Sequence, residues 1–140
     1  ETAGIYAQGR ASKPVFRGNR IKFCRCVGIT TFLDVDAYIL SNELITNDCG
    51  IEILNNKSRV IDNSIEKSHE DGIRIVGYDK NTRSTPYIWK NRIFSCGYNG
   101  ILCLGEFCEP DIRGNIIESN RMAGIKLTEF SSAQIGGTTQ

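Results

Sequence analysis

The chain has 140 residues, of which 40% are hydrophobic, so one domain could bury a substantial core. Its 17 basic and 16 acidic residues leave a formal net charge of +1, and they are spread along the chain. The sequence therefore lacks the basic stripe of a nucleic-acid binder and the long apolar run of a membrane span, and neither partner is expected.

A short motif recurs from the N-terminus to the C-terminus and divides the chain into repeats. A Gly-Ile pair returns every 22–28 residues, at Gly4, Gly28, Gly50, Gly72, Gly100 and Gly124. An Asn-x-(Ile/Leu) motif precedes the last five of these pairs by eight or nine residues, at Asn19, Asn42, Asn63, Asn91 and Asn115. The interval from each Gly to the next Asn varies more, so the insertions are confined to that part of each repeat.

Each repeat contains three short stretches in which apolar residues alternate with polar ones, which is typical of β-strands. In the first repeat they lie at residues 5–7, around Phe16 and around Ile21. The pattern then returns at 29–31, 39 and 44; at 51–53, 60 and 65; at 73–75, 88 and 93; and at 101–103, 112 and 117, and 125–127 begins a sixth repeat.

Three strands per repeat, with apolar positions that coincide from one repeat to the next, predict an all-β fold. The prediction is a right-handed parallel β-helix of about five coils of 22–28 residues, in which stacked coils share one core. A leucine-rich repeat would need an apolar residue five positions before each Asn, where this chain has Pro14, Ala37, Ser58, Pro86 and Pro110. We expect residues 1–140 to form a single domain that is a segment of a longer polypeptide.

The recurring Asn and Gly residues have expected structural roles in such a coil. The asparagines should stack as a ladder in which each side-chain amide hydrogen-bonds the Asn of the next coil. We also expect each Asn to adopt the left-handed backbone conformation at a bend, and each Gly of the Gly-Ile pairs to supply a second bend with positive φ.

The repeat Pro-x-(Ile/Phe)-Arg-Gly-Asn-x-Ile, followed nine residues later by Gly-Ile, occurs at residues 14–29 and 110–125. It resembles the β-helix repeats of the carbohydrate-binding and sugar-hydrolase (CASH) type. Among intracellular proteins it is most similar to the β-helix regions of the F-box only protein 11 and SHC SH2-domain-binding protein groups. The resemblance implies the fold and leaves the activity open, because unrelated functions use this scaffold.

The residues that could support catalysis or bind a metal do not form a recognisable site. The six cysteines, with one Cys-x-Cys and no Cys-x-x-Cys pair, do not match a zinc motif and are expected to be reduced and mostly buried. Asp34 and Asp36 could form a carboxylate pair for glycoside hydrolysis, but they fall in a variable segment, where a solvated loop is expected. His69 is expected in an exposed turn. We therefore predict no catalytic residue, no metal and no cofactor.

A binding surface is the stronger functional prediction. In the strand before each Asn, the outward positions should form one flat face with aromatic and Arg residues of the kind that dominate protein interfaces. The candidate residues on this face are Tyr38, Leu40, Arg59, Ile61, Tyr87, Trp89 and Arg113. The longest insertion, residues 77–86, enters beside them and adds Tyr78 and Arg83.

These observations favour a non-catalytic protein-recognition or scaffolding module of a larger intracellular protein (cytoplasmic, cytoskeletal or nuclear). Its expected partners are a protein and further coils or domains of the same polypeptide. Two alternatives stay open. One is a carbohydrate-binding or polysaccharide-cleaving β-helix, and the other is an architectural spacer in a cytoskeletal or ciliary assembly.

Overall fold

A computed structural model of the chain describes residues 3–136, and these residues contain strands, turns and bends but no helix. The strands form three parallel sheets. Sheet A contains β1 (Ala3–Gln8), β4 (Val27–Phe32), β7 (Cys49–Leu54), β10 (Ile73–Val76), β13 (Ile101–Leu104) and β16 (Ile125–Thr128). Sheet B contains β2 (Val15–Arg17), β5 (Tyr38–Leu40), β8 (Arg59–Ile61), β11 (Tyr87–Trp89), β14 (Asp111–Arg113) and β17 (Gln134–Gly136). Sheet C contains β3 (Arg20–Lys22), β6 (Glu43–Ile45), β9 (Ser64–Glu66), β12 (Arg92–Phe94) and β15 (Ile116–Glu118).

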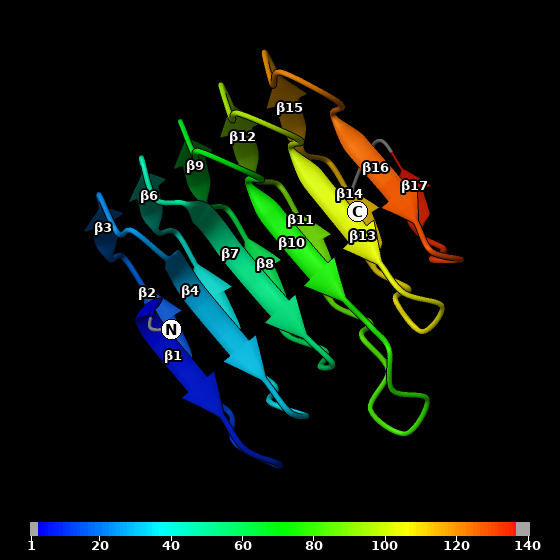
Figure 1. The fold of residues 1–140 in the computed structure, drawn as a ribbon. Helices are drawn as coiled ribbons and strands as arrows, with labels where there is room; N and C mark the ends of the chain where they lie inside the picture. The colour runs from blue at the N-terminus through cyan, green and yellow to red at the C-terminus, as the bar shows by residue number, and fades with distance from the viewer. Residues whose placement is uncertain (1–2, 137–140) are drawn as a thin grey trace.

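The chain visits the three sheets in the same order in every coil, A then B then C, and each strand pairs with its equivalents one coil away. Figure 1 shows the strands of sheet A side by side in order from β1 to β16, with the other two sheets behind them. The described residues make five complete coils, and β16 and β17 begin a sixth. The predicted β-helix with three short strands per coil is therefore confirmed. Residues 137–140, the end of the expected sixth repeat, lie outside the described part of the chain.

The register of the sheets places the predicted apolar columns one above another. In sheet A, Ile29, Ile51, Ile73 and Ile101 are successive partners, and all four are fully buried. The equivalent column of sheet B contains Ile39, Val60, Ile88 and Ile112, and that of sheet C contains Leu44, Ile65 and Ile93. These columns form the central core, and the inward residues of the outermost described coils are less buried.

The predicted asparagine ladder is present at the corner between sheets B and C. The Nδ2 atoms of Asn19, Asn42, Asn63 and Asn91 each donate to Oδ1 of the Asn in the next coil, at 3.0 Å. The same Oδ1 atoms accept the backbone N–H of the preceding Asn at 2.8–2.9 Å. The Nδ2 atom of Asn63 also donates to the carbonyl of Ile39 at 2.9 Å. From Asn42 to Asn115, each side-chain amide thus satisfies a backbone N–H and a carbonyl of the preceding coil.

The expectation that these asparagines turn the corner in the left-handed conformation is wrong. The residue with positive φ is the one immediately before each Asn: Gly18, Ser41, Asp62, Lys90 and Gly114, with φ between 55° and 67°. Because the preceding residue makes the bend, the Asn side chain can point into the corner. A second left-handed residue lies at the corner between sheets C and A, at Phe23, Thr46, Lys67, Ser95 and Ser119.

The glycines of the Gly-Ile pairs also have a different role from the expected one. None of the six has positive φ, so they do not supply a left-handed bend. A Cβ atom on Gly50 would lie 2.5 Å from the carbonyl oxygen of Gly72 and 2.7 Å from Cγ2 of Ile65. The same clash recurs in the column from Gly4 to Gly100, whereas the nearest atom to a Cβ on Gly124 is 3.6 Å away. These glycines are required by the close approach of successive coils.

We expect replacement of a central ladder residue to destabilise the fold strongly. Asn63→Ala removes the acceptor of the Asn42 amides and leaves buried polar groups unpaired, so the free energy of unfolding should fall by about 3 kcal/mol. Urea denaturation followed by circular dichroism measures it. Asn81→Ala, at an exposed loop position, is the control and should change stability by less than about 0.5 kcal/mol. Equal effects of the two substitutions on the free energy of unfolding would contradict a stabilising role of the ladder.

The glycine column provides a second test with a control in the same column. Gly50→Ala places a methyl group against backbone, which cannot easily shift, and should lower stability by about 3 kcal/mol. Gly124→Ala meets only an ordinary contact and should be nearly neutral. Thermal denaturation of the two variants compares them directly, and a tolerated Gly50→Ala would show that successive coils do not need this close approach.

Candidate functional site

The outward side chains of sheet B form two rows, as the sequence predicts. In the first row, Tyr38, Arg59, Tyr87 and Asp111 are partners in successive strands. In the second row, the successive partners are Leu40, Ile61, Trp89 and Arg113. The alternation along each three-residue strand turns the middle residue into the core and the outer two toward the surface. We call this surface the sheet B face.

The centre of the sheet B face is held by Arg59. Its guanidinium carbon lies 4.8 Å from the ring centroid of Tyr38 and 5.7 Å from that of Tyr87, so the cation lies between two aromatic rings. Arg59 also forms an ion pair with Asp36, in which both side chains are more than two-thirds buried. The rings of Tyr87 and Trp89 meet edge to face at 5.0 Å. These contacts order the aromatic side chains before any ligand binds.

The sheet B face is partly open to solvent. Tyr38 is 36% exposed and Tyr87 is 37% exposed, while Leu40, Ile61 and Trp89 are half-buried by their neighbours. Within the described part of the chain, Nε1 of Trp89 is buried and has no hydrogen-bond partner. Arg113, at the other end of the second row, is held by Asp111 at 2.6 Å.

Tyr78 and Arg83 do not join the sheet B face, contrary to the expectation from their place in the sequence. The 77–86 insertion lies over the corner between sheets A and B. There the Tyr78 hydroxyl donates to Glu129, and Arg83 forms an ion pair with Glu109 and lies 4.9 Å from the ring of Phe107. The insertion therefore packs along the corner and leaves the Tyr38–Arg59–Tyr87 row uncovered.

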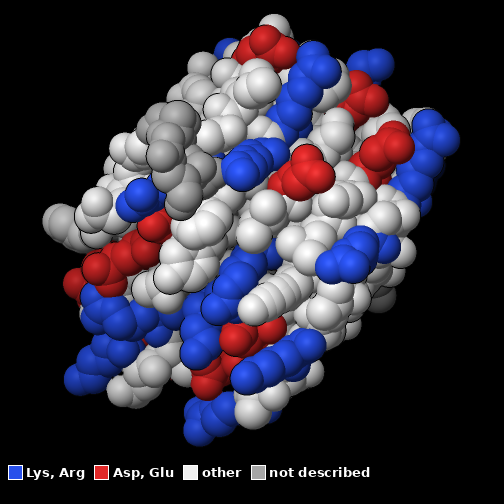
Figure 2. All heavy atoms as spheres, turned by 180° about the vertical axis from the view of Figure 1, so that it is seen from behind, with Lys and Arg blue, Asp and Glu red and all other residues white. Residues whose placement is uncertain are grey.

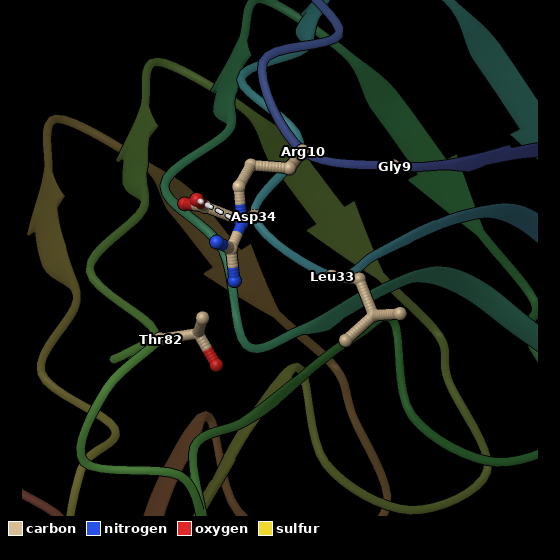
Figure 3. Close-up of a pocket in the computed structure, with 5 residues that line it drawn as sticks. All are labelled: Gly9, Arg10, Leu33, Asp34 and Thr82. Carbon is tan, nitrogen blue, oxygen red and sulfur yellow. Dashed lines mark ion pairs between the residues drawn. The ribbon is translucent and has the colours of Figure 1, made fainter.

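A small hollow of about 120 Å³ lies under the same corner. It is lined by Thr82 of the insertion and by Gly9, Arg10, Leu33 and Asp34 from the first two coils. Figure 3 shows the Arg10 guanidinium against the Asp34 carboxylate, with Thr82 at the lower left of this pair and Leu33 at its lower right. The Nε atom of Arg10 lies 3.7 Å from Oδ2 of Asp34. Asp34 is thus engaged by Arg10 and Asp36 by Arg59, so the sequence-proposed carboxylate pair is divided between two arginines.

The remaining titratable residues that the sequence singled out also have side-chain partners. His69 lies in an exposed turn, as predicted, with its Nδ1 2.8 Å from Oδ1 of Asp48. Its neighbours Glu70 and Asp71 are turned toward Arg74, which lies at 2.6 Å and 3.2 Å from them. Neither arrangement places a nucleophile beside a base. Figure 2 shows acidic and basic side chains interspersed on the far side of the molecule, without a large area of one sign.

An apolar stripe on the outside of sheet A was not predicted from the sequence. Phe32, Leu54, Val76 and Leu104 are successive partners and all are half-buried. The sequence does contain a pattern that indicates this stripe, because each of these residues lies four positions after a Gly of the Gly-Ile pairs. The stripe offers less aromatic surface than the sheet B face, since only one of its members is aromatic.

The six cysteines are all free thiols, and four of them are buried. Burial raises the pKa of Cys49 far above its ordinary value, and a hydrogen bond with Cys108 together with burial does the same for Cys103. Cys24 and Cys26 are half-exposed, and burial with the neighbouring Cys26 raises the pKa of Cys24. Among residues 3–136 no three potential ligand side chains gather into a metal-binding group, and no helix is long and apolar enough to cross a membrane.

Thiol labelling tests this distribution. Because a raised pKa lowers the thiolate fraction at a given pH and burial excludes the reagent, iodoacetamide at about pH 8 should modify Cys24 and Cys26 well before Cys49 and Cys103. Peptide mass mapping over time measures the order. In urea the difference should disappear. Equally rapid labelling of Cys49 in the folded protein would contradict its burial.

The comparisons with known proteins agree with the geometry of the coils. Residues 49–139, which are more than half of the chain, match the protein family described as the right handed beta helix region. Searches of curated proteins and of solved structures give no match. The predicted right-handed parallel β-helix is therefore confirmed, and the chain belongs to the right-handed β-helix family.

Proposed function

We propose that this chain is a non-catalytic protein-recognition module that binds its partner through the sheet B face. The observation that supports it best is the ordered row of Tyr38, Arg59 and Tyr87, with Trp89 beside it. Tyr, Trp and Arg are the residues that most often dominate the energy of protein interfaces. A partner would therefore find three of these residue types on one flat and regular surface.

The order of this surface before binding favours affinity. Association normally costs free energy to fix mobile side chains. On the sheet B face that cost is reduced, because Arg59 is already held by Asp36 and by two rings, and Tyr87 already contacts Trp89. Leu40 and Ile61 lie beside this row and add apolar area that is only half-buried in the free chain.

The surface is better suited to recognition than to catalysis. Asp36, which lies beside this surface, and Asp111, which belongs to its first row, are each paired with an arginine of the same face. Glycoside hydrolysis needs two carboxyl groups that face one substrate. We therefore propose that the module has no enzymatic activity of its own.

We further propose that this module belongs to a larger intracellular protein with repeats of the CASH type, similar to the F-box only protein 11 and SHC SH2-domain-binding protein groups. The support for this finer relationship is the repeated Pro-x-(Ile/Phe)-Arg-Gly-Asn-x-Ile motif. The free thiols suit a reducing compartment. In such a protein the coils could also serve as a spacer, which would have contacts on several faces rather than on one.

A carbohydrate ligand is the second candidate, and the tyrosine and tryptophan rings of the sheet B face are the observation that favours it. Aromatic rings at regular spacing provide stacking surfaces for sugars as well as for peptides. Leu40 and Ile61, however, offer no hydrogen-bonding group to sugar hydroxyls, and the backbone groups of the sheet are paired between coils. The protein partner is therefore the better match.

The proposal predicts that the double substitution Tyr87→Ala and Trp89→Ala abolishes partner capture and preserves the fold. The matched control is Tyr6→Ala with Tyr98→Ala, which removes two tyrosines that are 52% and 50% exposed and lie off sheet B. Quantitative mass spectrometry of proteins captured from cell extract compares the two variants with the unmodified chain. Capture that survives the first pair, or is lost equally with both pairs, counts against the sheet B face.

A polysaccharide panel separates the two candidates. Incubation with neutral and uronic-acid glycans should give neither retention of the chain nor new reducing ends. Retention that depends on Tyr87 and Trp89 would replace the protein partner by a glycan, and new reducing ends would overturn the non-catalytic assignment.

A further inference from the structure

The sheet B face continues into a second hollow, which lies at the corner where the chain enters sheet B. This hollow has a volume of about 270 Å³ and is lined by Arg10, Ala11, Lys13, Asp34, Asp36 and Lys57. Asp36 connects the two features, because it lines the hollow and also forms the ion pair with Arg59 of the sheet B face. A ligand on the face could thus reach the hollow without a break.

The hollow has an excess of positive charge. Lys13, Asp36 and Lys57 each lie two residues before the outward residues of the first row, Val15, Tyr38 and Arg59, so they follow one another from coil to coil. Asp34 and Asp36 are engaged by Arg10 and Arg59. Lys13 and Lys57 are both exposed. Among residues 3–136, neither lysine forms an ion pair with a carboxylate.

Most of the unpaired positive charge lies at one end of the surface. Arg17 of β2 is the partner of Leu40 and so belongs to the second row. It is also exposed and has no ion pair among the described residues. At the other end, Arg113 is paired with Asp111. Along the axis of the solenoid, three basic side chains without an ion pair among the described residues, Lys13, Arg17 and Lys57, belong to the first three coils. In the fourth coil the aromatic residues Tyr87 and Trp89 are accompanied by one such side chain, Lys90.

We propose that the partner of this surface is an extended acidic peptide segment that lies along the axis of the solenoid. Carboxylate or phosphate groups of the segment contact Lys13 and Lys57, and an apolar side chain packs on Tyr87 and Trp89. This inference rests on the proposed recognition function and adds the chemistry of the partner.

The dimensions of the surface fit such a segment. Tyr87 lies one coil beyond Lys57 and three coils beyond Lys13, and parallel strands are about 4.8 Å apart, so these side chains span about 14 Å. An extended chain advances about 3.3 Å per residue, so the apolar residue lies about one or two residues from the acidic group at Lys57 and about four from the acidic group at Lys13. The half-buried Leu40 and Ile61 favour the aliphatic groups of a peptide over the hydroxyls of a uronic-acid glycan.

Affinity selection from a random peptide library tests this chemistry. A displayed library of about twelve-residue peptides, long enough to span the surface, is selected on the 140-residue chain and on three variants. The first variant is Lys13→Glu with Lys57→Glu, and the second is Tyr87→Ala with Trp89→Ala. The third is the charge-matched control Lys22→Glu with Lys126→Glu, in which two exposed lysines of β3 and β16 are reversed.

The expected result is enrichment of peptides with acidic residues about one to four positions from an apolar side chain. A labelled peptide of this kind should lose affinity at least about tenfold on the Lys13/Lys57 variant, lose it also on the Tyr87/Trp89 variant, and keep it on the control. Its binding to the unmodified chain should weaken as salt increases. A phosphorylated version of the peptide distinguishes phosphate from carboxylate as the preferred anion.

Four outcomes would overturn the inference. Selected peptides without acidic residues that still require Tyr87 and Trp89 would refute the acidic partner and leave the proposed recognition function standing. Oligogalacturonate that binds in place of every peptide would make the ligand a glycan. Loss of binding on the Lys22/Lys126 control equal to that on the Lys13/Lys57 variant would reduce the effect to net charge. Selection of no peptide and no glycan would refute both the inference and the proposed function.

Discussion

The structure depends on one constraint, which is that every coil must place the same atoms over the same atoms of the next coil. The amide ladder from Asn19 to Asn115 imposes this constraint through directional hydrogen bonds. The glycine column imposes it through contact, because a Cβ atom at Gly28, Gly50 or Gly72 would meet the backbone of the next coil. The two devices lie at opposite ends of the segment between Asn and Gly, whose length is almost constant. The almost constant length of that segment therefore keeps equivalent residues of successive coils in register.

The candidate surface follows from this constant register. Because sheet B begins a constant number of residues before each Asn, its outward side chains form straight rows across the coils. A row brings together residues that are more than 20 positions apart in sequence, such as Tyr38, Arg59 and Tyr87. The cation between two rings, and the charge difference between the two ends of the surface, are properties of rows and not of any local segment.

The sequence predicted the coils, the strands and the outward rows, because periodic burial leaves a periodic record in residue type. It did not predict which residue adopts positive φ. Ser41, Asp62 and Lys90 carry the bend at the Asn corner, and these types share no property that would distinguish them in the sequence. The role of the glycines was predicted wrongly because a recurring glycine can indicate either a left-handed bend or a close approach of two backbones, and the sequence does not distinguish them. The partners of Tyr78 and Arg83 were also unpredictable, since an insertion of variable length has no column to which it can be compared.

The corner between sheets A and B has a consequence for how this architecture can change. Nearly all variation in coil length enters there, and the chain regains its register at the next Asn whatever the length of the inserted segment. The 77–86 insertion is the longest example, and the strands on either side of it pair as they do in the shorter coils. New segments introduced at this corner would therefore leave the register of the stack unchanged. The solenoid can acquire new specificities by exchanging loops along one ridge while its core sequence stays the same.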